Sequence, residues 1–115
     1  MPPVCVDASL VLNLLLPDEP DDHLSPLWSK WTETQTAVFG PPLIYAEVPS
    51  ALRHAVQSRR ISAEVGDLAF ETFQRLGIEI STRSDLHVVA WALAKTYNQS
   101  SLYDAMYLAA AQAEG

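Results

Sequence analysis

The sequence has little cysteine and little glycine. Its single cysteine, Cys5, has no partner among the 115 residues, which excludes a disulfide framework and a zinc site built from cysteines. The four glycines form neither G-x-G-x-x-G nor G-x-x-x-x-G-K-[ST], so the chain has no glycine-rich loop to cradle a phosphate. This composition fits a reducing compartment.

Basic residues are also scarce. Seven Lys and Arg stand against fourteen Asp and Glu, and the formal net charge is −7. This balance excludes a module that grips nucleic acid through bulk positive charge. A cluster of acids can nevertheless hold phosphate through a divalent cation, so the composition leaves a metal-dependent nuclease open.

A long uninterrupted apolar segment is missing as well. The apolar opening at residues 4–16 contains Asp7 and Asn13, and it follows neither a basic leader nor a cleavage site. We therefore expect a soluble, cytoplasmic protein that makes no contact with a membrane.

The apolar fraction of 49% is ordinary for a globular protein, and the length predicts one domain over residues 1–115. Short β-prone segments alternate with stretches of helical periodicity. The expected strands are 4–6, 37–39 and 78–80, and the expected helices are 10–16, 24–34, 43–59, 62–76, 84–97 and 101–115. This alternation predicts an α/β fold of three layers, with a parallel sheet between helices.

Four residues mark the ends of the predicted helices. Ser62, Ser84 and Ser101 are expected N-caps, because a serine hydroxyl accepts a hydrogen bond from the first turn. Gly77 is expected to end the helix at 62–76 in a left-handed conformation.

Glu47 lies on the apolar stripe of the helix predicted at 43–59. Its neighbours on that face are Leu43, Ile44 and Ala51, and an ionised carboxylate is costly there unless it is paired or bound to a metal. A glutamate at the edge of the stripe that reaches solvent explains the pattern equally well.

Asp104 and Asp7 each allow two interpretations. Asp104 shares an apolar helix face with Tyr107 and Leu108, but it also completes a capping box with Ser101. Asp7 follows the first strand, at the sheet edge where ligands bind in open α/β folds, but it or Ser9 could simply cap the next helix. Taken together, three acids from distant segments favour a site for Mg²⁺ or Mn²⁺.

Three segments in this order resemble the PIN domain family, specifically the VapC-type ribonuclease toxins of toxin–antitoxin pairs. The resemblance covers residues 4 to about 114. The matching segments are Val6-Asp7-Ala8-Ser9 with the stretch 14–20, Pro42-Leu43 with the stretches 45–48 and 51–53, and the stretch 92–94 with Tyr97 and 103–109.

The resemblance implies a function and the residues that carry it. The fold would be a three-layer PIN-like fold whose sheet has the order 3-2-1, and the activity would be Mg²⁺-dependent (or Mn²⁺-dependent) cleavage of RNA. By position, Asp7, Glu47 and Asp104 match catalytic and metal-binding acids, and Ser9 matches the hydroxyl that supports Asp7 and helps to position substrate. The implied partners are an RNA substrate and a cognate antitoxin. We also expect the chain to form a homodimer or a higher association.

The sequence departs from the family pattern in two ways. The fourth acid of the family, and the strands 4 and 5 that follow the last helix, have no counterpart before Gly115. Pro49 stands where the family has a helix-compatible residue, so we expect a kink beside Glu47 or a later helix start.

These departures leave two rival interpretations and one further expectation. The chain could be a catalytically impaired scaffold that binds an antitoxin-like partner, or an interaction domain whose three acids are only caps and surface charges. If the chain is truncated after the last helix, the apolar strand at 4–6 would be an open edge and would favour association with another chain.

Overall fold

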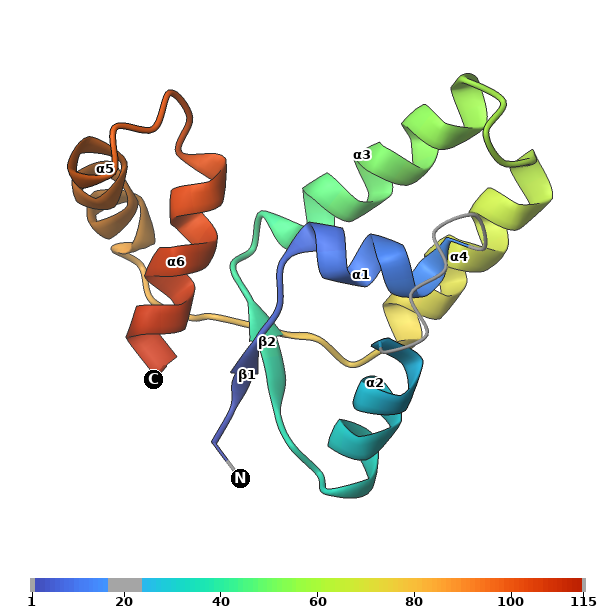
Figure 1. Ribbon diagram of the computed structural model, residues 1–115, viewed down its shortest axis with the longest axis horizontal. Helices are drawn as coiled ribbons and strands as arrows, with labels where there is room; N and C mark the ends of the chain where they lie inside the picture. The colour runs from blue at the N-terminus through green and yellow to red at the C-terminus, as the bar shows by residue number, and fades with distance from the viewer. Residues whose placement is uncertain (1, 17–23, 115) are drawn as a thin grey trace.

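The computed structural model describes residues 2–16 and 24–114, which contain three short strands and six helices (Figure 1). Residues 17–20, which are part of the first of the three matching sequence segments, lie outside the described residues. In chain order the elements are β1 (Val4–Cys5), α1 (Ala8–Leu15), α2 (Leu24–Glu33), β2 (Val38–Gly40), α3 (Ile44–Gln57), α4 (Ala63–Arg75), β3 (Glu79–Ile80), α5 (Leu86–Thr96) and α6 (Tyr103–Glu114).

The three strands form one parallel sheet in the order β1-β2-β3. Val4 is opposite Val38, and Phe39 is opposite Glu79 on the other side of β2. The parallel sheet and its strand order confirm the expectation from the sequence. Because parallel strands all end at the same edge, the loop after β1 opens beside the start of α3, which follows β2.

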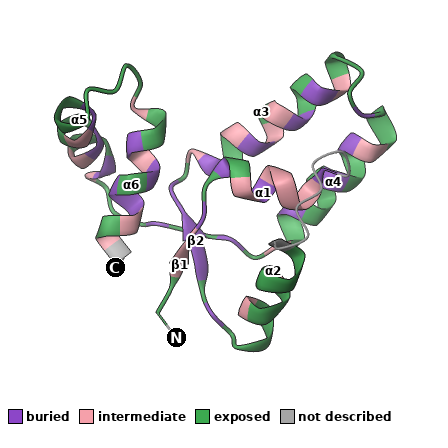
Figure 2. Cartoon of the chain, in the orientation of Figure 1, coloured by how far each residue is buried: buried purple, intermediate pink, exposed green. Residues whose placement is uncertain are grey.

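The sheet lies between two groups of helices, α1 to α4 on one side and α5 with α6 on the other (Figure 1). Each group has its own apolar core. Val11, Val48 and Phe73 are fully buried in the first, and the second is built largely from alanines of α5 and α6 packed on Phe39. The buried residues gather along the central strand β2 and on the helix faces turned toward the sheet (Figure 2). This arrangement is the predicted α/β fold of three layers.

Two of the predicted caps are confirmed, as is the glycine at the end of α4. Ser62 accepts a hydrogen bond from the backbone N–H of Val65 at 3.1 Å, and Ser101 accepts one from that of Tyr103 at 3.2 Å. Gly77 has a φ of 70°, the left-handed conformation that ends a helix without strain when the residue is glycine.

The expected cap at Ser84 is wrong. The residue at the N-cap of α5 is Asp85, and its side chain makes no capping hydrogen bond. The Asp85 carboxylate instead accepts two hydrogen bonds from Arg83, at 2.8 and 2.7 Å. A charged bidentate pair competes well for a carboxylate that could otherwise cap the helix.

Helix α3 runs through Pro49 without interruption, from Ile44 to Gln57. The later start that Pro49 suggested is therefore not seen. Glu47 lies in the first turn of this helix. None of the helices in the described ranges is long and apolar enough to span a membrane.

Candidate functional site

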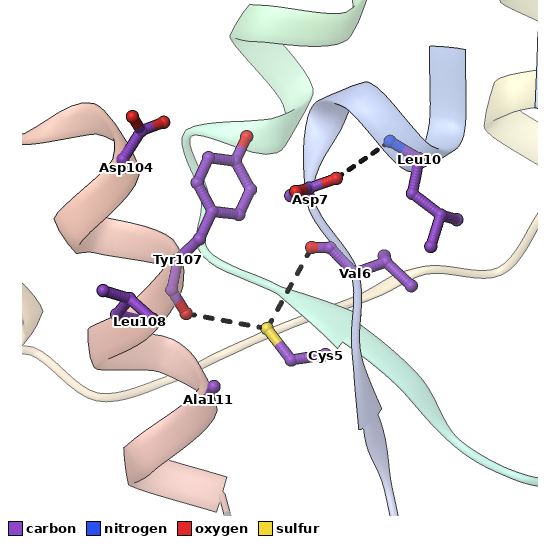
Figure 3. Close-up of a pocket in the computed structure, with 8 residues that line it drawn as sticks. All are labelled: Cys5, Val6, Asp7, Leu10, Asp104, Tyr107, Leu108 and Ala111. Atoms are coloured by element: carbon purple, nitrogen blue, oxygen red, sulfur yellow. Dashed lines mark hydrogen bonds between the residues drawn. The ribbon is translucent and has the colours of Figure 1, made fainter. Parts of the chain in front are cut away.

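A cavity of about 440 Å³ opens between the end of β1 and one face of α6 (Figure 3). Its lining residues come from the first eleven residues of the chain and from the last helix. They are Cys5, Val6, Asp7, Leu10, Asp104, Tyr107, Leu108 and Ala111. Two of the three acids predicted from the sequence therefore lie in the same cavity.

Asp7 has both of the roles that its position in the sequence allowed. Its Oδ1 accepts a hydrogen bond from the backbone N–H of Leu10 at 2.8 Å, so the residue is the N-cap of α1. The same carboxylate lies at the wall of the cavity (Figure 3). Because the cap holds one oxygen, it also fixes the direction of the carboxylate as a whole.

Asp104 reaches the cavity from the opposite wall. It lies in the first turn of α6, and its side chain is exposed rather than turned into a core. Figure 3 shows its carboxylate at the same end of the cavity as the hydroxyl of Tyr107. An exposed carboxylate at the rim of a cavity is accessible to a ligand.

Glu47 approaches the same region from α3. Its side chain is half-buried, and its Oε1 is fully buried with no hydrogen-bond partner. A buried carboxylate oxygen without a partner is uncommon in a folded protein, because it has lost its water without gaining a hydrogen bond. The charge of Glu47 acts on Tyr107, which places the carboxylate close to the cavity.

Each of the three acids lies at the N-terminal end of a helix. Asp7 caps α1, Glu47 is in the first turn of α3, and Asp104 is in the first turn of α6. The partial positive charge at a helix N-terminus stabilises a nearby carboxylate. The fold thus offsets part of the repulsion that three negative charges in one region would otherwise create.

Tyr107 is a candidate site residue that the sequence pattern did not reveal. The pattern places it on an apolar helix face, yet its hydroxyl oxygen is buried and has no hydrogen-bond partner. Burial raises the pKa of Tyr107 well above its usual range. The Glu47 carboxylate raises it further, through its negative charge and through its closeness to the hydroxyl, and Asp7 contributes less. The available signal was a hydroxyl one helical turn after Asp104 on an otherwise apolar stripe.

Ser9 faces a second cavity. Its side chain is exposed and lines a space of about 190 Å³ together with Asn13, Ala51 and Arg60. Asp7 and Ser9 are two residues apart at the start of α1, so their side chains point in different directions.

The donor chemistry of the site fits Mg²⁺ or Mn²⁺, because these ions prefer carboxylate oxygens and Glu47 offers one that is buried and unpaired. The geometry fits only in part. Within residues 2–16 and 24–114, no three His, Cys, Asp or Glu side chains are grouped so that they could hold a metal ion together. The ring of Tyr107 stands between Asp104 and Asp7 (Figure 3). The structure therefore brings Asp7 and Asp104 to one cavity but does not gather all three carboxylates around one point.

Comparison with known proteins gives one match. A family model described as the PIN domain matches residues 4–115, almost the whole chain. No curated protein and no solved structure matches the chain. Proteins with this domain are in general nucleases that use divalent metal ions.

Proposed function

The chain belongs to the PIN domain family, and from this premise we propose that it is an endoribonuclease dependent on Mg²⁺ or Mn²⁺, acting as the toxin of a toxin–antitoxin pair. The observation that carries the proposal is the pair Asp7 and Asp104, which comes from opposite ends of the sequence to one cavity at the end of β1. We assign Glu47 as the third carboxylate, because it has a buried, unpaired oxygen and its charge acts on Tyr107, which lines the same cavity.

The residues of the chain have distinct roles in this proposal. Two carboxylates at the cavity are accessible to a cation. Asp7 is held in place by its hydrogen bond from the Leu10 N–H, and Asp104 is exposed on the opposite wall. Glu47 completes the ligand set from α3. A bound Mg²⁺ or Mn²⁺ supplies a water of lowered pKa and polarises the phosphate that is attacked. Cleavage would leave 5′-phosphate and 3′-hydroxyl ends.

RNA with an accessible backbone, such as a single strand or a loop, is the proposed substrate. The net charge of −7 supports binding through the cation rather than through a basic surface. Ser9 is proposed to position the substrate from the second cavity. Arg60 also lines that cavity, and a guanidinium suits a phosphate of the same RNA strand.

The proposed protein partners are an antitoxin and a second copy of the chain. The first cavity combines apolar walls from Leu10, Leu108 and Ala111 with the carboxylates of Asp7 and Asp104. An antitoxin segment with an apolar anchor and a basic side chain is complementary to this arrangement. Among the described strands, β1 pairs only with β2, so its other edge can accept a strand from another copy.

Cleavage of a single-stranded RNA by the purified protein tests the proposal. We expect cleavage with Mg²⁺ or Mn²⁺, none with EDTA, and a loss of at least ~100-fold in Asp7→Asn, Glu47→Gln and Asp104→Asn. Glu71→Gln is the control, because Glu71 is an exposed acid on α4 and does not line the cavity. Undiminished cleavage in EDTA contradicts the proposal.

A catalytically impaired scaffold is the second candidate function. The observation that favours it is that the described residues do not already gather three metal-binding side chains into one group. The same assay separates the two candidates. Specific binding of Mn²⁺ without any RNA cleavage supports the scaffold, and cleavage that needs Asp7 supports the ribonuclease.

A further inference from the structure

Two buried polar atoms without partners lie in the same part of the molecule. They are Oε1 of Glu47 on α3 and the hydroxyl oxygen of Tyr107 on α6. The first can only accept a hydrogen bond when ionised, and the second can donate one. Leaving each of them unpaired costs about 1–3 kcal/mol, so a pairing between them would remove two penalties at once.

The position of Tyr107 makes such a pairing accessible. Its helix neighbours Ala105, Ala109 and Ala110 belong to the core built by α5 and α6, whereas Tyr107 belongs to the other core, which also contains Ile44 and Val48 of α3. Ile44 and Val48 flank Glu47 on the same helix. In Figure 3 the Tyr107 ring passes between Asp104 and Asp7, with its hydroxyl on the side of α3.

We propose that Tyr107 is a positioning residue for Glu47, and that its hydroxyl donates a hydrogen bond to the Glu47 carboxylate when the site holds a divalent cation. This inference rests on the proposed function, because it concerns the same site. The hydroxyl directs the carboxylate toward the cavity that Asp7 and Asp104 line. A hydrogen-bond donor behind a metal ligand fixes the direction of that ligand and improves its binding.

The charge on Glu47 supports this pairing. A tyrosine hydroxyl is protonated at neutral pH, so it is available as a donor. The thiol of Cys5 and the carboxylate of Asp7 are the other titratable groups that act on Tyr107, and they change its pKa in the same direction as Glu47 does. A donor held between carboxylates also offsets part of their mutual repulsion.

Titration with Mn²⁺ alone, without RNA, measures the effect directly. We expect Tyr107→Phe to weaken Mn²⁺ binding about 10-fold or more. Its thermal midpoint in EDTA should be equal to that of the wild type or higher, since the change removes an unpaired buried hydroxyl and keeps the ring. Tyr103→Phe is the matched control, because Tyr103 lies one turn earlier on α6, is exposed and does not line the cavity.

The double variant Glu47→Gln/Tyr107→Phe separates positioning from a general structural effect. If Tyr107 acts through Glu47, removing its hydroxyl in the Glu47→Gln background should change the Kd for Mn²⁺ by less than about twofold. A loss as large as in the wild-type background overturns the inference.

Two further outcomes distinguish this inference from the proposed function. If the wild type binds no Mn²⁺, both fail. If the wild type binds Mn²⁺ and Asp7→Asn or Glu47→Gln weakens the binding while Tyr107→Phe does not, only the role of Tyr107 is overturned.

Discussion

The thiol of Cys5 donates a weak hydrogen bond to the backbone carbonyl of Tyr107, over 3.7 Å, and so joins β1 to α6. Both residues line the first cavity, and the negative charge of Asp7 acts on both side chains. Burial and the charge of Asp7 raise the pKa of the Cys5 thiol, and the pKa of Tyr107 is raised as well.

The raised pKa values predict that the protein is less stable in alkali. In the window above the pKa values of the unfolded groups, about 8.5 for Cys and 10 for Tyr, the folded state binds more protons than the unfolded state. The free energy of unfolding should therefore fall as the pH rises from 8 to 10.5 in urea titrations. Cys5→Ala and Tyr107→Phe should each make this fall smaller. An equally steep fall in both variants would contradict the argument.

Two substitutions at Asp7 should separate its cap from its charge. Asparagine can accept the Leu10 N–H as aspartate does, so Asp7→Asn should keep the stability of the wild type and lose Mn²⁺ binding and RNA cleavage. Asp7→Ala should also lose about 1 kcal/mol of stability, since it removes the cap. Urea unfolding in EDTA, beside Mn²⁺ titration, checks both. If Asp7→Asn binds Mn²⁺ as tightly as the wild type does, Asp7 is not a metal ligand.

Ser9→Ala should weaken RNA binding more than metal binding. Ser9 and Arg60 line the same second cavity, so we expect KM for RNA to rise roughly 2-fold to 10-fold. This range corresponds to the free energy of one lost hydrogen bond. The Kd for Mn²⁺ should stay that of the wild type. Ser50→Ala is a suitable control, because Ser50 is exposed on α3 and lines neither cavity. A large loss of Mn²⁺ affinity in Ser9→Ala would instead indicate that Ser9 supports Asp7.

Gly66→Ala should destabilise the contact between α3 and α4. Alanine is normally the better helix former, but a Cβ at Gly66 would lie 2.5 Å from Cγ2 of Val56. We expect a loss of about 1–3 kcal/mol from this overpacking. The double variant Val56→Ala/Gly66→Ala removes the clashing methyl groups and should be more stable than an additive combination of the two single variants. Additive losses in urea unfolding would show that no clash is involved.

Light scattering during size-exclusion chromatography checks the proposed self-association. Among the described strands β1 is paired on one side only, and this edge predicts association that increases with protein concentration. A stable monomer at all concentrations would contradict this.

The sequence by itself determined the fold class and the chemistry of the acids. Apolar periodicity located the strands of the sheet and the helices around it, because burial of one face decides where such a segment can lie. Ser62 and Gly77 were identifiable from the sequence since capping depends on a few neighbouring backbone groups. Asp7, Glu47 and Asp104 were candidates because carboxylates at strand ends and on apolar faces conflict with their surroundings.

Only the tertiary structure decided how these residues lie relative to one another. The sequence could not show that Ser9 faces the second cavity while Asp7 faces the first, or that Asp85 binds Arg83. It also could not show that Tyr107 reaches from one core into the other and leaves its hydroxyl unpaired near Glu47. The physical reason is that periodicity reports only whether a side chain is turned inward. Which polar atoms meet there depends on how α3 and α6, which are distant in the sequence, pack against the end of β1.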